Sequence, residues 1–127
     1  MASWDDVRSI ALGLPGAVEE DNGRTRSWRV GARAFAWERL LRRAERELLG
    51  DRAPPGPALG LRTADPGVVE ALVATDPGVF LTVAGYGLHP MVLVHVERAA
   101  VEDLDEVLVE AWWCRAPRRL REELRGR

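Results

Sequence analysis

The chain has 127 residues, of which 46% are hydrophobic and 30% charged, and 18 basic side chains nearly balance 20 acidic ones. A chain of this length can bury a core of its own, which excludes a disordered protein and one that needs metal or disulfide staples to fold. The net charge of −2 gives no overall attraction for polyanions, and no apolar run approaches the roughly 20 residues that span a bilayer.

The first elements in chain order are a helix, a loop and a hairpin. Ser3 can cap a helix that ends near Gly13, because apolar residues then repeat at helical spacing. Residues 14–16 and the polar run 19–23 predict a loop. Residues 24–39 predict a β-hairpin with a two-residue turn at Gly31 and Ala32.

The hairpin register decides which side chains share a face. A two-residue turn pairs Val30 with Arg33, and strict alternation then places one set of side chains together. The further expected pairs are Trp28 with Phe35, Arg26 with Trp37, and Arg24 with Arg39. We therefore predict that Trp28, Phe35 and Trp37 lie on one sheet face, with arginines at its border.

The second half alternates further helices and strands. Residues 40–50 are good helix formers without a clear apolar stripe, which predicts a short helix or an exposed connection. The prolines in 51–57 predict a surface loop. Asp65 and Pro66 are typical of a helix start. The other predictions are strands at 58–62, 79–83 and 91–96, a hairpin connection over 85–90, a helix over 101–112 and a short last helix from Pro117. The strand at 91–96 is almost wholly apolar, so we expect it to be central and covered on both faces.

These elements predict an α+β fold, a single compact domain over residues 1–127, in which an antiparallel sheet packs against N-terminal and C-terminal helices. The lone cysteine, Cys114, cannot form an intrachain disulfide, and the N-terminus lacks the order of a signal peptide. We therefore expect a cytoplasmic protein with no membrane segment.

Several short segments together resemble the MmcQ/YjbR family. They occur in the family's order over most of the chain: Leu14-Pro15-Gly16 with Glu19-Glu20, Trp28-Arg29-Val30-Gly31 with Arg33-Ala34-Phe35-Ala36, Asp76-Pro77-Gly78-Val79-Phe80, Pro90-Met91-Val92-Leu93-Val94, and Glu110-Ala111-Trp112. The resemblance implies a double-wing or frataxin-like α+β domain. It also implies DNA binding, the label that such proteins commonly carry.

Two groups of arginines are candidates for phosphate contacts. The first comprises Arg24, Arg26 and Arg33 of the hairpin, and the second Arg115, Arg118, Arg119 and Arg121 of the C-terminal segment. That segment, residues 115–127, holds six arginines and two glutamates. Guanidinium groups pair well with phosphate, so we expect weak, salt-sensitive DNA binding. The alternatives are that the aromatic rings face the core, and that the C-terminal arginines neutralise the acidic helix before them.

A protein-interaction or small-ligand module is the competing function, with a groove beside Tyr86 and His89. The two histidines have no recognised metal spacing, and no nucleophile elbow or phosphate-binding glycine loop occurs. We therefore expect no metal, no cofactor and no enzymatic activity. A monomer and a homodimer both remain open.

Overall fold

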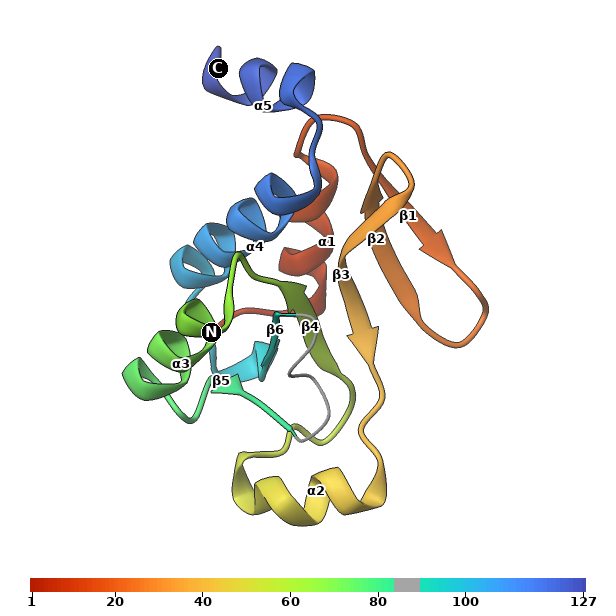
Figure 1. Ribbon diagram of the computed structural model, residues 1–127. Coiled ribbons are helices and arrows are strands. Elements are labelled where there is room, and N and C mark those ends of the chain that lie inside the picture. Colours follow the sequence, from red (N-terminus) through yellow and green to blue (C-terminus); the bar gives the residue numbers. More distant parts are fainter. Residues whose placement is uncertain (84–89) are drawn as a thin grey trace.

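The computed structural model describes residues 1–83 and 90–127, within which one antiparallel sheet of six strands is covered by helices. The strand order is β1-β2-β3-β4-β6-β5. Figure 1 shows α1 and α4 side by side against the sheet, with α2 and α5 at opposite ends of the molecule. This is the predicted α+β architecture with N-terminal and C-terminal helices on the sheet.

The helices and strands have the following bounds. The helices are α1 (Trp4–Leu12), α2 (Arg43–Leu49), α3 (Pro66–Thr75), α4 (Val101–Arg115) and α5 (Arg118–Arg125). The strands are β1 (Ala17–Asp21), β2 (Arg26–Val30), β3 (Arg33–Arg39), β4 (Ala58–Arg62), β5 (Phe80–Leu81) and β6 (Met91–Val94). Two short 3₁₀ turns follow α2 and β6, at Gly50–Arg52 and Val96–Arg98.

Local side-chain caps fix where two helices begin. Ser3 Oγ accepts a hydrogen bond from the backbone N–H of Asp6, and the Asp6 carboxylate accepts one from the N–H of Ser3. Asp65 caps α3 by accepting from the N–H of Val68, and Pro66 occupies the first turn. Such caps satisfy N–H groups that have no partner within the helix. Both starts agree with the sequence prediction.

The two sheet faces pack against different layers. The larger core lies under α1 and α4 and includes Trp28, Phe35, Leu61 and Trp112, all fully buried. The smaller cluster lies on the other face, where Leu49 of α2 packs with Ala58 of β4 and with Met91 and Leu93 of β6. The β6 strand is buried at every position, as expected for a strand covered on both faces.

The hairpin register departs from the prediction at a β-bulge. Val30 pairs with Arg33 as expected, but the register shifts between Trp28 and Arg29, so Trp28 faces Ala36 instead of Phe35. The extra residue in β3 lets Phe35 and Ala36 both enter the larger core. The following side chains therefore change faces. The predicted pair of Arg26 with Trp37 is wrong, because Trp37 pairs with Ser27.

Because of the bulge, the three hairpin rings do not share a face. Trp28 and Phe35 lie in the larger core, whereas Trp37 packs with the smaller cluster on the opposite side of the sheet. There Trp37 covers Gly60, where even a methyl group would collide with its indole ring. The prediction of a common aromatic surface is therefore wrong for Trp37.

Other differences concern the ends of elements. Most of the polar run predicted as a loop forms β1, which pairs with β2 from Ala17 opposite Val30 to Asp21 opposite Arg26. The strand predicted over 79–83 is only two residues long, and the strand predicted over 91–96 ends at Val94. Pro117 precedes α5 as its N-cap residue. The predicted connection 85–90, except Pro90, lies outside the described residues.

Across the described ranges 1–83 and 90–127, no helix is both long enough and apolar enough to cross a membrane.

Candidate functional site

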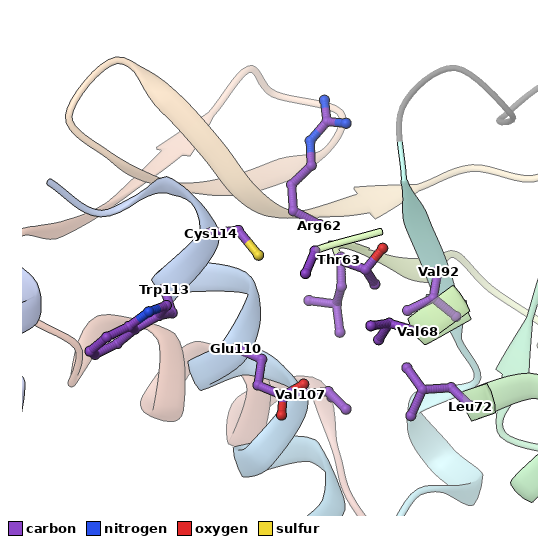
Figure 2. A pocket seen from close by; sticks show the side chains of 11 residues that line it. Arg62, Thr63, Val68, Leu72, Val92, Val107, Glu110, Trp113 and Cys114 are labelled. Carbon is purple, nitrogen blue, oxygen red and sulfur yellow. The ribbon is translucent and has the colours of Figure 1, made fainter. Parts of the chain in front are cut away.

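Two adjoining cavities open at the end of β4, beside the corner between α4 and α5. We call the larger one, of about 480 Å³, the arginine pocket; its walls include Arg62, Thr63, Trp113, Cys114, Arg115 and Arg121. The smaller one, of about 250 Å³, we call the apolar cavity; its walls include Leu61, Val68, Leu72, Val92 and Val107. Thr63, Trp113 and Cys114 border both, and Figure 2 shows the apolar cavity from close by.

Three elements bring the three arginines together. Arg62 ends β4, and since side chains alternate along a strand, it points away from the face on which Leu61 packs under α4. Arg115 is the last residue of α4, where the extended conformation of Ala116 before Pro117 ends the helix. Arg121 lies on α5, just beyond this corner. The pocket is thus built where one strand and two helices end or begin.

Four buried polar atoms of this pocket lack partners among the described residues. The Nε atoms of Arg62, Arg115 and Arg121 and the Oγ1 of Thr63 are buried, and none has a hydrogen-bond partner within residues 1–83 and 90–127. No carboxylate occurs among the described residues that line the pocket. Unpartnered buried donors cost free energy, so a bound group that accepts hydrogen bonds would stabilise this arrangement.

The charges of the pocket also repel one another. Burial lowers the pKa of Arg62, and the nearby positive charge of Arg115 lowers it further. The guanidinium of Arg62 lies over the ring of Trp37, 5.3 Å from its centroid. The guanidiniums of Arg121 and Arg125 lie 5.3 and 4.9 Å from the centroid of Trp113. These ring contacts hold the arginines in place without neutralising them.

Cys114 borders both cavities with its thiol. Burial raises the pKa of Cys114, and the smaller opposing effects of Arg115 and Arg121 do not reverse that shift. Figure 2 shows its sulfur directed toward Thr63. Such a thiol stays protonated near neutral pH, so it contributes neither a nucleophile nor a negative charge to the pocket.

The predicted hairpin arginines lie apart from this pocket. Arg24 is exposed beside the turn between β1 and β2, and Arg26 binds the carboxylate of Glu38, with 3.2 Å between Nη2 and Oε2. The hydrogen bond to Glu38 raises the pKa of Arg26. Because Glu38 already occupies this guanidinium, Arg26 is poorly placed to bind phosphate.

Arg33 begins β3 at the other end of the hairpin and is exposed. Its partner Val30 lies close to Gly16, which also contacts Leu120 of α5. The end of the hairpin that carries Arg33 is therefore the end beside α5, whereas Arg24 and Arg26 lie at the opposite end. The structure does not gather the three hairpin arginines into one surface.

The C-terminal arginines divide between pocket and surface. Arg115 and Arg121 line the pocket, whereas Arg118 and Arg119 are exposed. Arg118 pairs with Glu122 of the same helix, at 3.1 Å from Nε to Oε1. Within the described parts of the chain, no ion pair joins the acidic residues of α4 to the arginines of α5. The alternative of neutralisation between these two helices therefore has no direct ion pair behind it in this part of the chain.

The remaining candidates are the predicted groove residues and the other histidine. Tyr86 and His89 lie outside the described residues. His95 is buried, with its Nδ1 3.3 Å from the carbonyl oxygen of Arg52. Residues 1–83 and 90–127 contain no group of three histidine, cysteine or acidic side chains that could hold a metal ion.

The pocket residue that sequence reasoning missed is Arg62. A single arginine at the end of a buried strand is ordinary in a sequence, and nothing in its neighbours points to Arg115 or Arg121. The pair Arg62 and Thr63, polar residues directly after an apolar strand, is the one signal that could have directed attention to this strand end.

Comparisons with known proteins give a family but no activity. The family model for YjbR matches residues 12–114. Uncharacterized protein Rv2570 of Mycobacterium tuberculosis and uncharacterized protein Mb2600 of Mycobacterium bovis are each 43% identical over 123 residues, covering 94% of this chain and 93% of theirs. The crystal structure of Deinococcus radiodurans protein DR2400, with a DUF419 domain, has a TM-score of 0.65 at 21% identity and covers 98% of this chain and 88% of that one. This likeness supports the fold alone.

Proposed function

Since the chain belongs to the YjbR family, and the mycobacterial relatives named above are uncharacterised, we propose a function from the site itself: the protein binds a small anion in the arginine pocket and does no chemistry on it. The anion is a carboxylate or a phosphate. These are the groups whose oxygens match the planar fork of a guanidinium.

One observation carries the proposal. Three arginines from β4, α4 and α5 line one cavity, each with a buried Nε that has no partner among the described residues. Like charges held together disfavour the empty pocket, and an anion would relieve both the repulsion and the missing hydrogen bonds. A pocket with this wall attracts negative charge although the whole chain is slightly negative.

Binding is favoured over catalysis because the described wall offers no group poised to react. The Cys114 thiol has a raised pKa, and no general base of the described residues lies within hydrogen-bond distance of the Thr63 Oγ1. A hydroxyl needs such a base to become a nucleophile. Arginine binds and orients anions, but it stays charged and cannot exchange protons near neutral pH.

A matched pair of variants on α5 tests the proposal. Arg121 and Arg125 both stack on Trp113, but only Arg121 lines the pocket among these two. Inorganic phosphate at ten times its Kd should raise the thermal unfolding midpoint of the native protein by roughly 5 °C, a stabilisation of about 1.4 kcal/mol. Arg121→Gln should lose most of this rise and Arg125→Gln should keep it, at ionic strength held constant with sodium chloride.

The result that overturns the proposal is equally specific. If phosphate and acetate both leave the unfolding midpoint of the native protein unchanged, no anion site exists. If Arg121→Gln and Arg125→Gln respond alike, the arginines act through Trp113, and their role is to hold α5 in place.

Nucleic-acid phosphate is the second candidate, favoured by exposed Arg118 and Arg119 on the helix that also carries Arg121. Phosphate contacts along a backbone release counterions, so such binding falls steeply with salt. Fluorescence anisotropy with duplex DNA at low salt separates the two candidates. DNA binding should be weakened by Arg118→Gln with Arg119→Gln, whereas a small-anion site should be indifferent to that change.

A further inference from the structure

The arginine pocket and the apolar cavity are two parts of one space. The residues that border both include Arg62, Thr63, Trp113 and Cys114. The two parts therefore share the same wall where they meet. An anion bound by the arginines would therefore have an apolar compartment directly behind it. This juxtaposition constrains what else the ligand can carry.

On its α3 side, the apolar cavity is lined by side chains that the protein itself leaves half-covered. Helix α3 is rich in valine and leucine, yet none of its residues is buried. Val68 and Leu72 are half-buried and face the cavity opposite Leu61 and Val92 of the sheet. Figure 2 shows these four elements of the wall closing around the same space: α3, α4, β4 and β6. Apolar area left open to water would gain from an apolar occupant.

The size of the cavity limits that occupant. Its volume is about 250 Å³, larger than the roughly 150 Å³ of an apolar cavity that can hold a benzene molecule. An alkyl chain or ring system of roughly six to ten carbons matches this space by the same comparison. A larger body would have to extend out of the cavity.

The charges at the two ends set the orientation. The arginines lie at one end, and the carboxylate of Glu110 borders the apolar cavity near Val107. An anionic head would be repelled by Glu110 and attracted by Arg62, Arg115 and Arg121. The head therefore belongs in the arginine pocket, where Thr63 can donate a further hydrogen bond.

From these observations we infer that the ligand is an amphiphilic anion: a carboxylate or phosphate head held by the arginines, with an apolar body of about six to ten carbons in the cavity beneath α3. This inference rests on the proposed anion site and specifies its ligand class. The same head chemistry could belong to an alkyl carboxylate or to an alkyl phosphate.

Isothermal titration calorimetry with four probes tests the inference on the full chain. Octanoate should bind at least tenfold more tightly than acetate, and octyl phosphate at least tenfold more tightly than inorganic phosphate. Acetate and inorganic phosphate bind through the head group alone, so the one with the lower Kd identifies the preferred head group. Arg121→Gln should weaken both long probes.

A variant that fills the cavity separates the body from the head. Val68→Phe places a ring in the cavity, so the affinity for octanoate should fall to the affinity for acetate. The affinity for acetate itself should not change. Ala71→Phe, an exposed position on the same helix, should leave all four probes unchanged. If Val68→Phe does not fold, chain length in the native protein gives the same answer: affinity should rise from acetate through hexanoate to octanoate and stop rising beyond about ten carbons.

The outcomes distinguish the inference from the proposed function. If acetate binds and octanoate binds no more tightly than acetate, the inference is wrong, but the proposed anion site is still supported. Octanoate binding that Arg121→Gln does not weaken also overturns it, because the head would then lie elsewhere. No binding of any probe overturns both.

Discussion

Cys114 combines a central place in the site with a chemistry that can be followed directly. It is the chain's single cysteine and borders both the arginine pocket and the apolar cavity. Burial opposes its ionisation, whereas Arg115 and Arg121 favour it, and burial prevails. The pKa of the Cys114 thiol therefore depends on the balance between desolvation, which raises it, and the nearby positive charges, which lower it.

We predict that alkylation of Cys114 is slow at neutral pH and that its rate rises with a midpoint above the roughly 8.5 of a free thiol. The thiolate is the reacting species, and the raised pKa shifts its appearance to higher pH. The measurement is the rate of N-ethylmaleimide modification between pH 6.5 and 10, with Cys114→Ser as the unreactive control. A midpoint at or below that of a free thiol would show that the arginines dominate over burial.

Single residues also show why part of the site was predictable. Arg115 and Arg121 were singled out because arginines cluster in the C-terminal segment, which is a local property of the sequence. Arg62 could not be found this way, because its neighbours in the pocket come from α4 and α5. Arg26 was selected for its charge, but its partner Glu38 depends on the hairpin register.

At the scale of elements, the bulge in β3 determines on which face of the sheet the later side chains of this strand lie, and so which other elements they contact. Helix caps, prolines and apolar spacing predicted most helices and strands, because those signals act within a few residues. Strict alternation failed after Phe35, since the sequence does not reveal where an extra residue will be accommodated. Trp37 consequently packs against the smaller cluster, and the guanidinium of Arg62 lies over the Trp37 ring at the edge of the pocket.

The contact between Trp37 and Gly60 gives a prediction at this scale. Gly60→Ala should lower the free energy of unfolding by about 1–3 kcal/mol, because the added methyl collides with the indole and forces overpacking. Gly56→Ala is the matched control, since nothing lies within 4 Å of its Cβ position and its stability should stay the same or rise slightly. Urea unfolding of both variants is the measurement. Equal stability of the two would mean that Trp37 moves aside freely.

At the scale of the whole molecule, the site is a product of topology. Trp112 donates a hydrogen bond from Nε1 to the carbonyl oxygen of Pro15 at 2.9 Å, which anchors α4 to the connection before β1. The Nη1 of Arg127 donates to the carbonyl oxygen of Gly13 at 2.7 Å and ties the chain's C-terminal end to the same connection. These long-range contacts hold the last turn of α4 and the chain end after α5 near one connection, and Arg121 of α5 lines one pocket with Arg62 of β4. No local pattern could have predicted them.

The sheet order makes β1 an edge strand, and this has a consequence for self-association. Its carboxyl-terminal half is acidic, at Glu19, Glu20 and Asp21. A second molecule adding its own β1 in antiparallel fashion would bring carboxylates into close opposition, which discourages fibre-like growth through this strand. Replacing Glu20 and Asp21 together by threonine should therefore raise the mean mass in light scattering. The same loss of charge at exposed Glu102 and Asp103 of α4 should leave it unchanged.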